Sequence, residues 1–229
     1  MARWHGTAKR ATIEFVVIVT GVLVALGVDA WRDAGREREA EASYVARLID
    51  DVRADSIELS GALRVGAAKE SRLARLMALD EQTVASTSEL SAVVADLQGS
   101  QSWGWEYPTA RRVTFDELLS VGGLRLIRDV ELREAISRYY WLHEDTEDRV
   151  ESRRSELPRL VYSLVLLGED PEDAEVGSQP ALIRAVRSGQ LRESAASELN
   201  FTRYQVGTTE YLIEEGGSLL LRLRAYGGS

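Results

Sequence analysis

An uncharged stretch rich in Val and Ile near the N-terminus constrains this chain more than any other feature. The segment IEFVVIVTGVLVALGVDAW covers residues 13–31, and residues 15–28 carry no charge. Residues 11–30 would form about 30 Å of helix, which matches the hydrocarbon thickness of a bilayer. Backbone groups in lipid must be paired within their own segment, so a helix is favoured over a strand. The stretch therefore predicts a transmembrane helix over residues 11–31, after a basic tail over residues 1–10.

Two other interpretations of this stretch stay open. Its basic start, apolar middle and the small residues at 28–30 also fit a cleaved signal peptide, although Glu14 and Asp29 fit one poorly. An uncharged middle of this length also suits a buried helix of a soluble protein. The flanks favour the membrane anchor, because Trp4 and Trp31 bracket the segment where interfacial indoles usually lie.

The predicted span would present apolar side chains to lipid and small side chains to a neighbouring helix. Gly21 and Ala25 form a small-xxx-small pair, which lets two helices approach closely. Gly is also common in membrane helices that have no such contact. The middle of the span has no ionisable residue, so the sequence offers no proton relay or ion pathway there. The residues expected to contact lipid are Phe15, Val16, Ile18, Val19, Val22, Leu23 and Leu26.

The distribution of basic residues sets the expected orientation. Three basic residues precede the span and three Arg follow it closely, so the two sides are nearly balanced. The compact basic tail favours a cytoplasmic N-terminus. We therefore expect a single-pass protein of the inner (cytoplasmic) membrane, with the bulk of the chain on the periplasmic side.

Residues 32–229 have the pattern of an all-α domain. Apolar residues recur at helical spacing between Val45 and Leu76, which predicts one long helix that ends before residue 81 and can be continuous with the span. Shorter helices are expected over residues 89–98, after a Thr114–Glu117 capping box, after Asp129, and from Pro180 to Gly189. The longest periodic pattern predicts a packing seam of Leu191, Ala195, Leu199, Thr202, Val206, Thr209, Ile213, Gly216, Leu220 and Leu223. An antiparallel helical bundle with long helices is therefore the expected fold of this domain.

Residue types that carry chemistry are scarce. The chain has no Cys and two His, of which His143 continues an apolar helical stripe and is expected to be packed or half-buried rather than catalytic. No zinc-protease, di-iron, P-loop, dinucleotide or nucleophile-elbow motif occurs. The acidic loop over residues 169–173 is expected to be solvated, although its carboxylates could also hold calcium. The sequence therefore predicts no catalytic, cofactor-binding or metal-binding residues.

An aromatic loop is the strongest candidate for contact with a partner. Trp103, Trp105 and Tyr107 lie in a loop that also contains Gly and Ser. Large aromatic side chains often anchor interfaces, but they can equally fold back over a bundle or touch a membrane surface. Two hypotheses for this loop stay open: a lid over the core, and a contact with a partner or the membrane.

Two blocks of the sequence resemble a known bacterial family. The block EFVVIVTGVLVALGVDAWRD, followed by YVARLIDDVRAD, is similar to the start of a family of uncharacterised single-span membrane proteins, and residues 114–140, TFDELLSVGGLRLIRDVELREAISRYY, are similar to its central block. The resemblance implies a Val/Ile-rich anchor helix and a helical domain of unknown function. It implies no activity and no functional residues.

These features together favour a non-catalytic, membrane-anchored accessory or structural subunit that stabilises a larger membrane protein complex, photosynthetic or respiratory. The expected partners are the membrane and other subunits of that complex. The net charge of −9 argues against a nucleic-acid partner, and no small-molecule substrate is evident. The alternative is an extracytoplasmic helical sensor or ligand-binding domain.

Overall fold

The chain is almost entirely helical, in agreement with the predicted all-α class. The structure is a computed structural model that describes residues 4–101, 107–120, 122–166 and 175–228, with the backbone alone for residues 4–18, 87 and 88. The elements in chain order are α1 (Trp4–Met77), α2 (Glu81–Ala85), α3 (Thr87–Gly99), α4 (Val113–Ser120), the 3-10 helix η1 (Gly123–Leu126), α5 (Val130–Ser152), α6 (Glu156–Leu164), β1 (Val165–Leu166), β2 (Glu175–Val176), α7 (Gln179–Arg187) and α8 (Gln190–Gly227).

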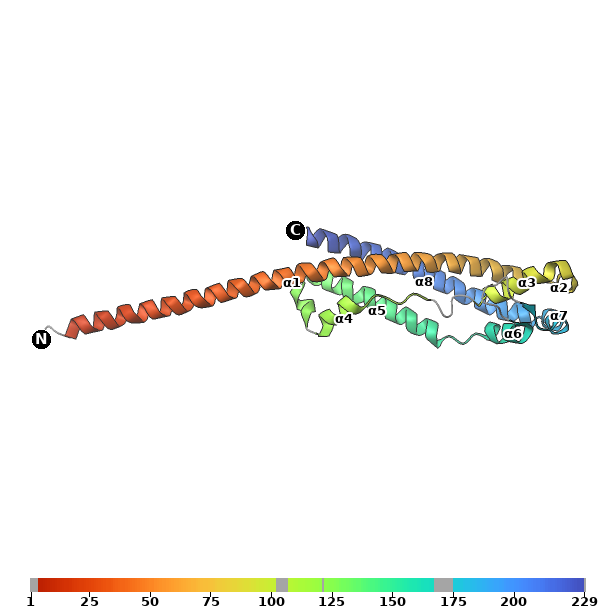
Figure 1. Ribbon diagram of the computed structural model, residues 1–229, viewed down its shortest axis with the longest axis horizontal. Helices are drawn as coiled ribbons and strands as arrows, with labels where there is room; N and C mark the ends of the chain where they lie inside the picture. The colour runs from red at the N-terminus through yellow and green to blue at the C-terminus, as the bar shows by residue number, and fades with distance from the viewer. Residues whose placement is uncertain (1–3, 102–106, 121, 167–174, 229) are drawn as a thin grey trace.

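The first helix, α1, is a single element of 74 residues. The predicted span and the long helix behind it are therefore one continuous helix. Its second half packs in the bundle, whereas its first half extends away from all other elements (Figure 1). Val45 is the first buried residue along α1 in the part whose side chains are described. No proline lies within α1, so nothing in its sequence interrupts the hydrogen-bond ladder.

The centre of the bundle is an antiparallel coiled coil of α1 and α8, which lie side by side along most of α8 (Figure 1). The buried positions of both helices alternate in steps of three and four, which is the spacing that keeps two helices in contact along a seam. On α1 they are Val45, Leu48, Val52, Asp55, Leu59, Ala62, Gly66, Lys69, Leu73 and Leu76. On α8 they are Leu191, Ala195, Glu198, Thr202, Gln205, Thr209, Leu212, Gly216, Leu219 and Leu223, with Leu199 also buried.

This seam differs from the predicted one at alternate positions. Gln205, Leu212 and Leu219 are buried, whereas the predicted Val206, Ile213 and Leu220 are only half-buried at the edge of the contact. At Gln205 and Val206 the prediction followed the more apolar residue, and it then kept the shifted register at Ile213 and Leu220. The observed seam follows the three-and-four spacing even where this places a polar side chain inside.

The third long helix, α5, runs parallel to α1 and antiparallel to α8. Asp129 caps its start, since the side chain accepts a hydrogen bond from Leu132 N at 3.1 Å, as predicted. The direction follows from two contacts with α8: Arg138 of α5 pairs with Glu215, and Arg153, just past the end of α5, meets the earlier residue Glu198.

Two apolar clusters form the core, one at each end of the bundle. The cluster nearer the N-terminal extension joins α1, α4, α5 and the end of α8 around Leu48, Phe115 and Tyr140. The cluster at the far end joins the end of α1 to α3, α6, α7 and the start of α8 around Leu97 and Leu182. Polar residues occupy much of the seam between them.

Three local predictions need comment. The capping box is wrong: α4 begins at Val113, so Thr114 lies inside the helix and is buried, and Glu117 instead accepts hydrogen bonds from Tyr44 and Arg47 of α1. Pro180 does lie in the first turn of α7, and Gly189, with φ of 80°, separates α7 from α8 as predicted. The antiparallel pairing of β1 with β2 was not predicted, because two-residue strands leave no periodic pattern.

Candidate functional site

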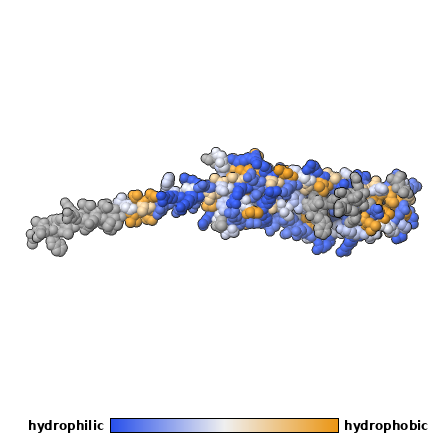
Figure 2. Space-filling model, viewed as in Figure 1, coloured by the Kyte–Doolittle hydropathy of each residue, from blue (hydrophilic) through white to orange (hydrophobic). Residues whose placement is uncertain are grey.

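The exposed N-terminal half of α1 is the first candidate functional feature. Of the residues predicted to contact lipid, Val19, Val22, Leu23 and Leu26 are exposed, with Leu23 at 62%. They form an apolar band on the extension, set apart from the largely hydrophilic bundle (Figure 2). The side chains of the other three, Phe15, Val16 and Ile18, lie outside the described residues. Within the described part of the chain, no helix is both long and apolar enough to cross a membrane.

The small residues of the predicted helix contact are also exposed. Gly21 and Ala25 both lie on the extension, and a Cβ atom built at Gly21 has no neighbouring atom within 4 Å. The structure therefore confirms the helical conformation of the predicted span and leaves this face open. It does not bring the pair into contact with any described residue.

A belt of buried polar side chains in the middle of the bundle is the second candidate feature. It lies between the two apolar clusters and contains residues of all three long helices. Its members are Asp55 and Lys69 of α1, His143 and Thr146 of α5, and Glu198, Thr202, Gln205 and Thr209 of α8. Buried polar groups are costly unless they find partners, so the contacts of each decide what the belt can do.

Asp55 is held by two donors. The backbone N–H of Arg111 donates to Asp55 Oδ1 at 2.9 Å, and the hydroxyl of Tyr139 donates to Oδ2 at 3.1 Å. Burial raises the pKa of this carboxyl to about 6, although the two hydrogen bonds oppose the change. Asp55 therefore ties the chain before α4 and the middle of α5 to α1.

His143 is buried, in agreement with the prediction that it is packed in the bundle. Its ring lies edge-on to Tyr139, with the centroids 4.7 Å apart. Neither ring nitrogen has a hydrogen-bond partner among the described residues. Burial, and then the charge of Arg112, lower its pKa to about 4, so the imidazole is neutral at pH 7. An enclosed neutral imidazole cannot reach a substrate in this conformation.

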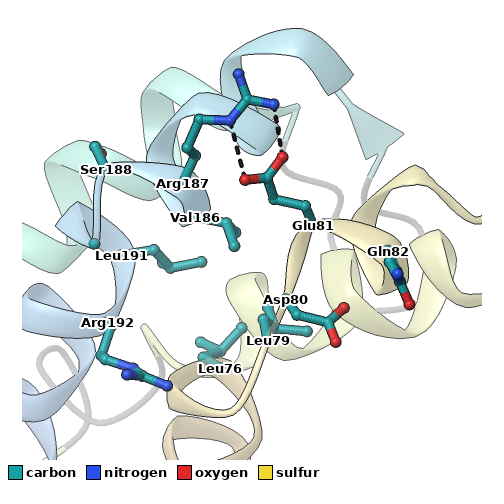
Figure 3. Close-up of a pocket in the computed structure, with 11 residues that line it drawn as sticks. Leu76, Leu79, Asp80, Glu81, Gln82, Val186, Arg187, Ser188, Leu191 and Arg192 are labelled. Atoms are coloured by element: carbon teal, nitrogen blue, oxygen red, sulfur yellow. Dashed lines mark hydrogen bonds and ion pairs between the residues drawn. The ribbon is translucent and has the colours of Figure 1, made fainter.

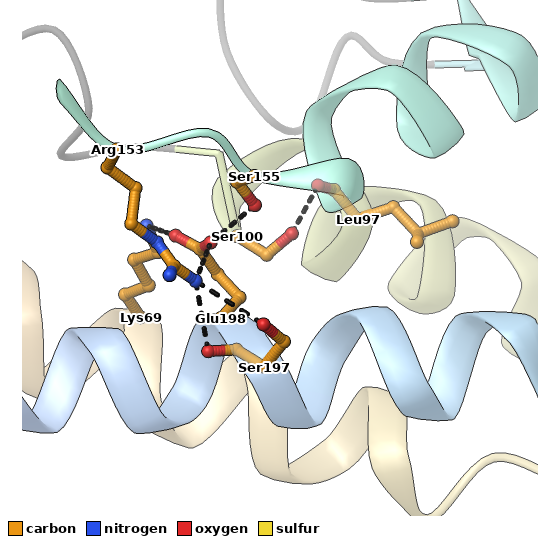
Figure 4. Close-up of polar contacts among 7 residues, drawn as sticks. All are labelled: Lys69, Leu97, Ser100, Arg153, Ser155, Ser197 and Glu198. Atoms are coloured by element: carbon orange, nitrogen blue, oxygen red, sulfur yellow. Dashed lines mark hydrogen bonds and ion pairs between the residues drawn. The ribbon is translucent and has the colours of Figure 1, made fainter.

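Lys69 and Glu198 form a buried ion pair at the far side of the belt (Figure 4). Lys69 Nζ donates to Glu198 Oε1 at 2.6 Å, and the hydroxyl of Ser155 donates to Oε2 at 2.6 Å. Burial alone would raise the pKa of Glu198, but Lys69, Ser155 and Arg153 together hold it below its ordinary value. The pair links α1 to α8 at one register and also fixes the connection between α5 and α6.

Arg153 sits above this pair in a fixed position. Its Nη2 donates to the backbone oxygen of Ser197 at 3.1 Å (Figure 4). Its guanidinium lies 4.2 Å above the ring of Phe201. Its Nε is buried and has no partner among the described residues. A cavity of about 600 Å³ opens beside Arg153, between α6 and α8. We call it the α6–α8 cavity.

A second hollow, of about 650 Å³, lies at the tip of the bundle where α1, α2, α7 and α8 meet (Figure 3). Leu76 and Leu191 line its floor. Arg187 spans one side by two hydrogen bonds to Glu81, of 2.6 and 3.0 Å. Of the other charged groups here, Asp80 accepts a hydrogen bond from Thr83 N, and Arg192 donates one to the backbone oxygen of Met77.

The predicted aromatic loop lies only partly within the described residues. Tyr107 is half-buried, and its hydroxyl lies 3.2 Å from that of Thr209 on α8. Burial raises the pKa of Tyr107 to about 12. Trp103 and Trp105 lie outside the described residues, as does the acidic loop over residues 169–173. Among the residues that are described, no group of three or more His, Asp or Glu side chains could hold a metal ion.

The α6–α8 cavity was not predicted from the sequence. Arg153 stands in a strongly polar run, and Phe201 and Gln205 lie 48 and 52 residues later, so no local motif joins them. Counting α8 in steps of four and three from Leu191 would have placed Gln205 inside. That buried amide is the one signal available in the sequence.

No family model, curated protein or solved structure matches this chain. The similarity of the two sequence blocks to a family of single-span proteins stays a prediction.

Proposed function

We propose that the protein is a single-span, membrane-anchored accessory subunit whose helical bundle braces other subunits of a larger membrane complex. One observation carries this proposal. Residues 19–28 of α1 project beyond the bundle, and their apolar side chains are exposed although a helix of water-soluble protein normally buries them (Figures 1 and 2). We further propose that the span lies in the inner membrane, with the bundle on the periplasmic side.

The distribution of these side chains favours lipid as their surroundings. A helix turns about 100° per residue, so Val22, Leu23 and Val24 point in three different directions, and all three are more than half exposed. A helix that docks in a protein groove needs an apolar stripe and a polar back. A helix that is apolar all round suits the interior of a bilayer.

The accessory role is supported by the surface of the bundle. Trp141 of α5, Tyr162 of α6, and Tyr204 and Tyr211 of α8 are exposed aromatic side chains. Such residues are the usual anchors of protein interfaces. Gly21 and Ala25 add a face on which a helix of a partner subunit could pack within the membrane. The enclosed position of His143 favours a non-catalytic role.

Charged substitutions in the span test the anchor. Leu23→Asp with Leu26→Asp should move the protein from the membrane fraction to the soluble fraction, because each carboxylate costs about 3 kcal/mol in the middle of a span. Ile57→Asp with Leu221→Asp is the matched control, since these side chains are equally exposed, at 67% and 68%, but belong to the bundle. Release of the control, or retention of the span variant, would overturn the anchor.

Purification in mild detergent tests the accessory role. Mass spectrometry of the co-purifying chains should find at least one partner in a fixed ratio, and Gly21→Leu with Ala25→Leu should reduce its amount without releasing the protein from the membrane. A monomer without stoichiometric partners would contradict the subunit role and leave the anchor standing.

A second function, a ligand-binding domain outside the cytoplasm, is favoured by the α6–α8 cavity. Arg153 Nε has no partner among the described residues, and a purely bracing role leaves this observation unexplained.

A further inference from the structure

The α6–α8 cavity has the size of a site for a small molecule. Its volume of about 600 Å³ falls within the range of small-ligand pockets, about 300 to 1,000 Å³. Elements far apart in the sequence form its walls: the connection between α5 and α6, the outer face of α6 and the middle of α8. The buried Lys69–Glu198 pair forms part of its lining, so the site rests on a fixed base (Figure 4).

Two buried nitrogen atoms at this cavity lack partners among the described residues. They are Arg153 Nε and Gln205 Nε2. The Gln205 side chain is almost wholly buried, with 1% exposed, and still lines the cavity. A guanidinium can only donate hydrogen bonds, so the missing partner of Arg153 has to be an acceptor. Leaving a buried donor unpaired is unfavourable, and an acceptor brought by a ligand would remove that cost.

The charge of the lining favours an anionic acceptor. Lys69, Arg153, Arg154 and Arg159 face three glutamates, Glu151, Glu156 and Glu198, so the lining has a net charge of +1 in a chain of −9. Glu198 is engaged by Lys69 at 2.6 Å and also lies 3.7 Å from Arg153 Nη2, and Glu156 lies 3.7 Å from Arg159. The Nε atom of Arg153 is outside these pairs. Arg153 is already oriented by Ser197 and Phe201, so a ligand would find its guanidinium in place.

The same cavity also offers aromatic surface. Phe201 lies beneath the Arg153 guanidinium, and Tyr162 lines the cavity with 61% of its surface exposed. Flat apolar groups pack well against such rings. We propose that the α6–α8 cavity binds a small aromatic carboxylate, with the carboxylate received by Arg153 and Gln205 and the ring lying against Tyr162 and Phe201.

This site belongs to the bundle and does not depend on the membrane anchor or on partner subunits. Binding can therefore be tested on the full-length protein in detergent by isothermal titration calorimetry, with benzoate as the probe. We expect saturable binding of benzoate, and binding at least tenfold weaker for benzamide, the neutral molecule of the same shape, and for the cation benzylamine.

Two variants locate the binding. Gln205→Leu should weaken benzoate binding at least tenfold and raise the melting temperature of the empty protein, because it removes a buried amide nitrogen that has no partner among the described residues. Tyr162→Ala changes only an exposed side chain, so it should keep the fold and also weaken benzoate. Trp141→Ala removes an equally exposed aromatic outside the cavity and should leave binding unchanged.

Three outcomes would overturn the proposal: no saturable binding of benzoate, binding that both Gln205→Leu and Tyr162→Ala leave intact, or benzylamine binding as tightly as benzoate. None of these outcomes would contradict the proposed membrane anchor, because that proposal is tested separately by membrane fractionation of variants at residues 23 and 26.

Discussion

Asp55 and His143 give the stability of the bundle opposite dependences on pH. Asp55 keeps its proton in the folded state up to about pH 6, while the unfolded chain loses it near 3.8, so this group lowers stability as the pH rises through that window. His143 stays neutral in the folded state down to about pH 4, while the unfolded chain gains a proton near 6.5, so this group raises stability with pH. Each shift is equivalent to about 3 kcal/mol, so the two nearly cancel.

Removing one of the two groups should reveal the pH dependence of stability that the other group contributes. In Asp55→Asn, the free energy of unfolding should rise by about 3 kcal/mol between pH 4 and 6.5, because only His143 still titrates. In His143→Leu, the free energy of unfolding should fall between pH 4 and 6, because only Asp55 still titrates. Urea unfolding at a series of pH values measures both slopes. Equal slopes in the two variants would show that these residues do not control the pH dependence.

Breaking the buried Lys69–Glu198 pair should lower the free energy of unfolding strongly, whereas replacing both residues with apolar ones should lower it little. Glu198→Gln leaves the ammonium of Lys69 buried without a countercharge, which should lower the free energy of unfolding by about 3–5 kcal/mol. Lys69→Met with Glu198→Leu should recover most of this loss, because two apolar side chains of similar size fill the space. Chemical denaturation measures both. Glu81→Gln, which breaks an exposed pair with Arg187, is the control and should change stability little.

The role of a residue could be predicted where neighbouring residues in the sequence decide it. His143 was placed in the core correctly because it continues a stripe on its own helix. The role of Glu117 was not predicted correctly, because TFDE has the form of a capping box. Only the fold brings Tyr44 and Arg47 to the Glu117 carboxylate. Arg153 likewise has no local motif, since Phe201 and Glu198 reach it from another helix.

At the scale of elements, Gly216 lies where α8 packs closely on the other two long helices. A Cβ atom at Gly216 would lie 3.2 Å from Tyr139 Cε2 and 3.5 Å from Ser56 Oγ, whereas at Gly217 it would meet nothing within 4 Å. Both alanine variants gain the same helix propensity. We expect Gly216→Ala to be less stable than Gly217→Ala by about 1–3 kcal/mol, the cost of overpacking.

Thermal and urea unfolding of the two variants side by side would measure that difference, because the two positions are neighbours in the same helix and only Gly216 is buried against the other helices. Equal stabilities would mean that Tyr139 moves aside without cost.

The helices themselves were largely predictable, and the register of the seam was not. Helical spacing and end residues such as Asp129, Pro180 and Gly189 are local, so they mark α5, α7 and α8 in the sequence. The choice between Gln205 and Val206 is decided by the neighbouring helices. By hydropathy Val206 belongs inside, but the three-and-four spacing set by the rest of α8 and by the Lys69–Glu198 contact buries Gln205.

At the scale of the whole molecule, the absence of cysteine allows a direct test of orientation. Thr7→Cys places a thiol in the basic tail, and Ser60→Cys places one on the exposed side of α1 within the bundle. With the bundle in the periplasm, a membrane-impermeant maleimide should label Ser60→Cys in cells with an opened outer membrane. It should label Thr7→Cys only after lysis. The reverse pattern would place the bundle in the cytoplasm.

Because α1 is one unbroken helix, a tilt at one end moves the other end. From Trp31 to Met77 the helix spans about 70 Å, so its far end moves with any tilt of the segment that holds it. A tilt of about 20°, ordinary for a membrane helix, would sweep the tip of the bundle sideways by roughly 25 Å. If the anchor lies in a membrane as we propose, a partner in that membrane could move the tip hollow across a wide arc without bending the protein.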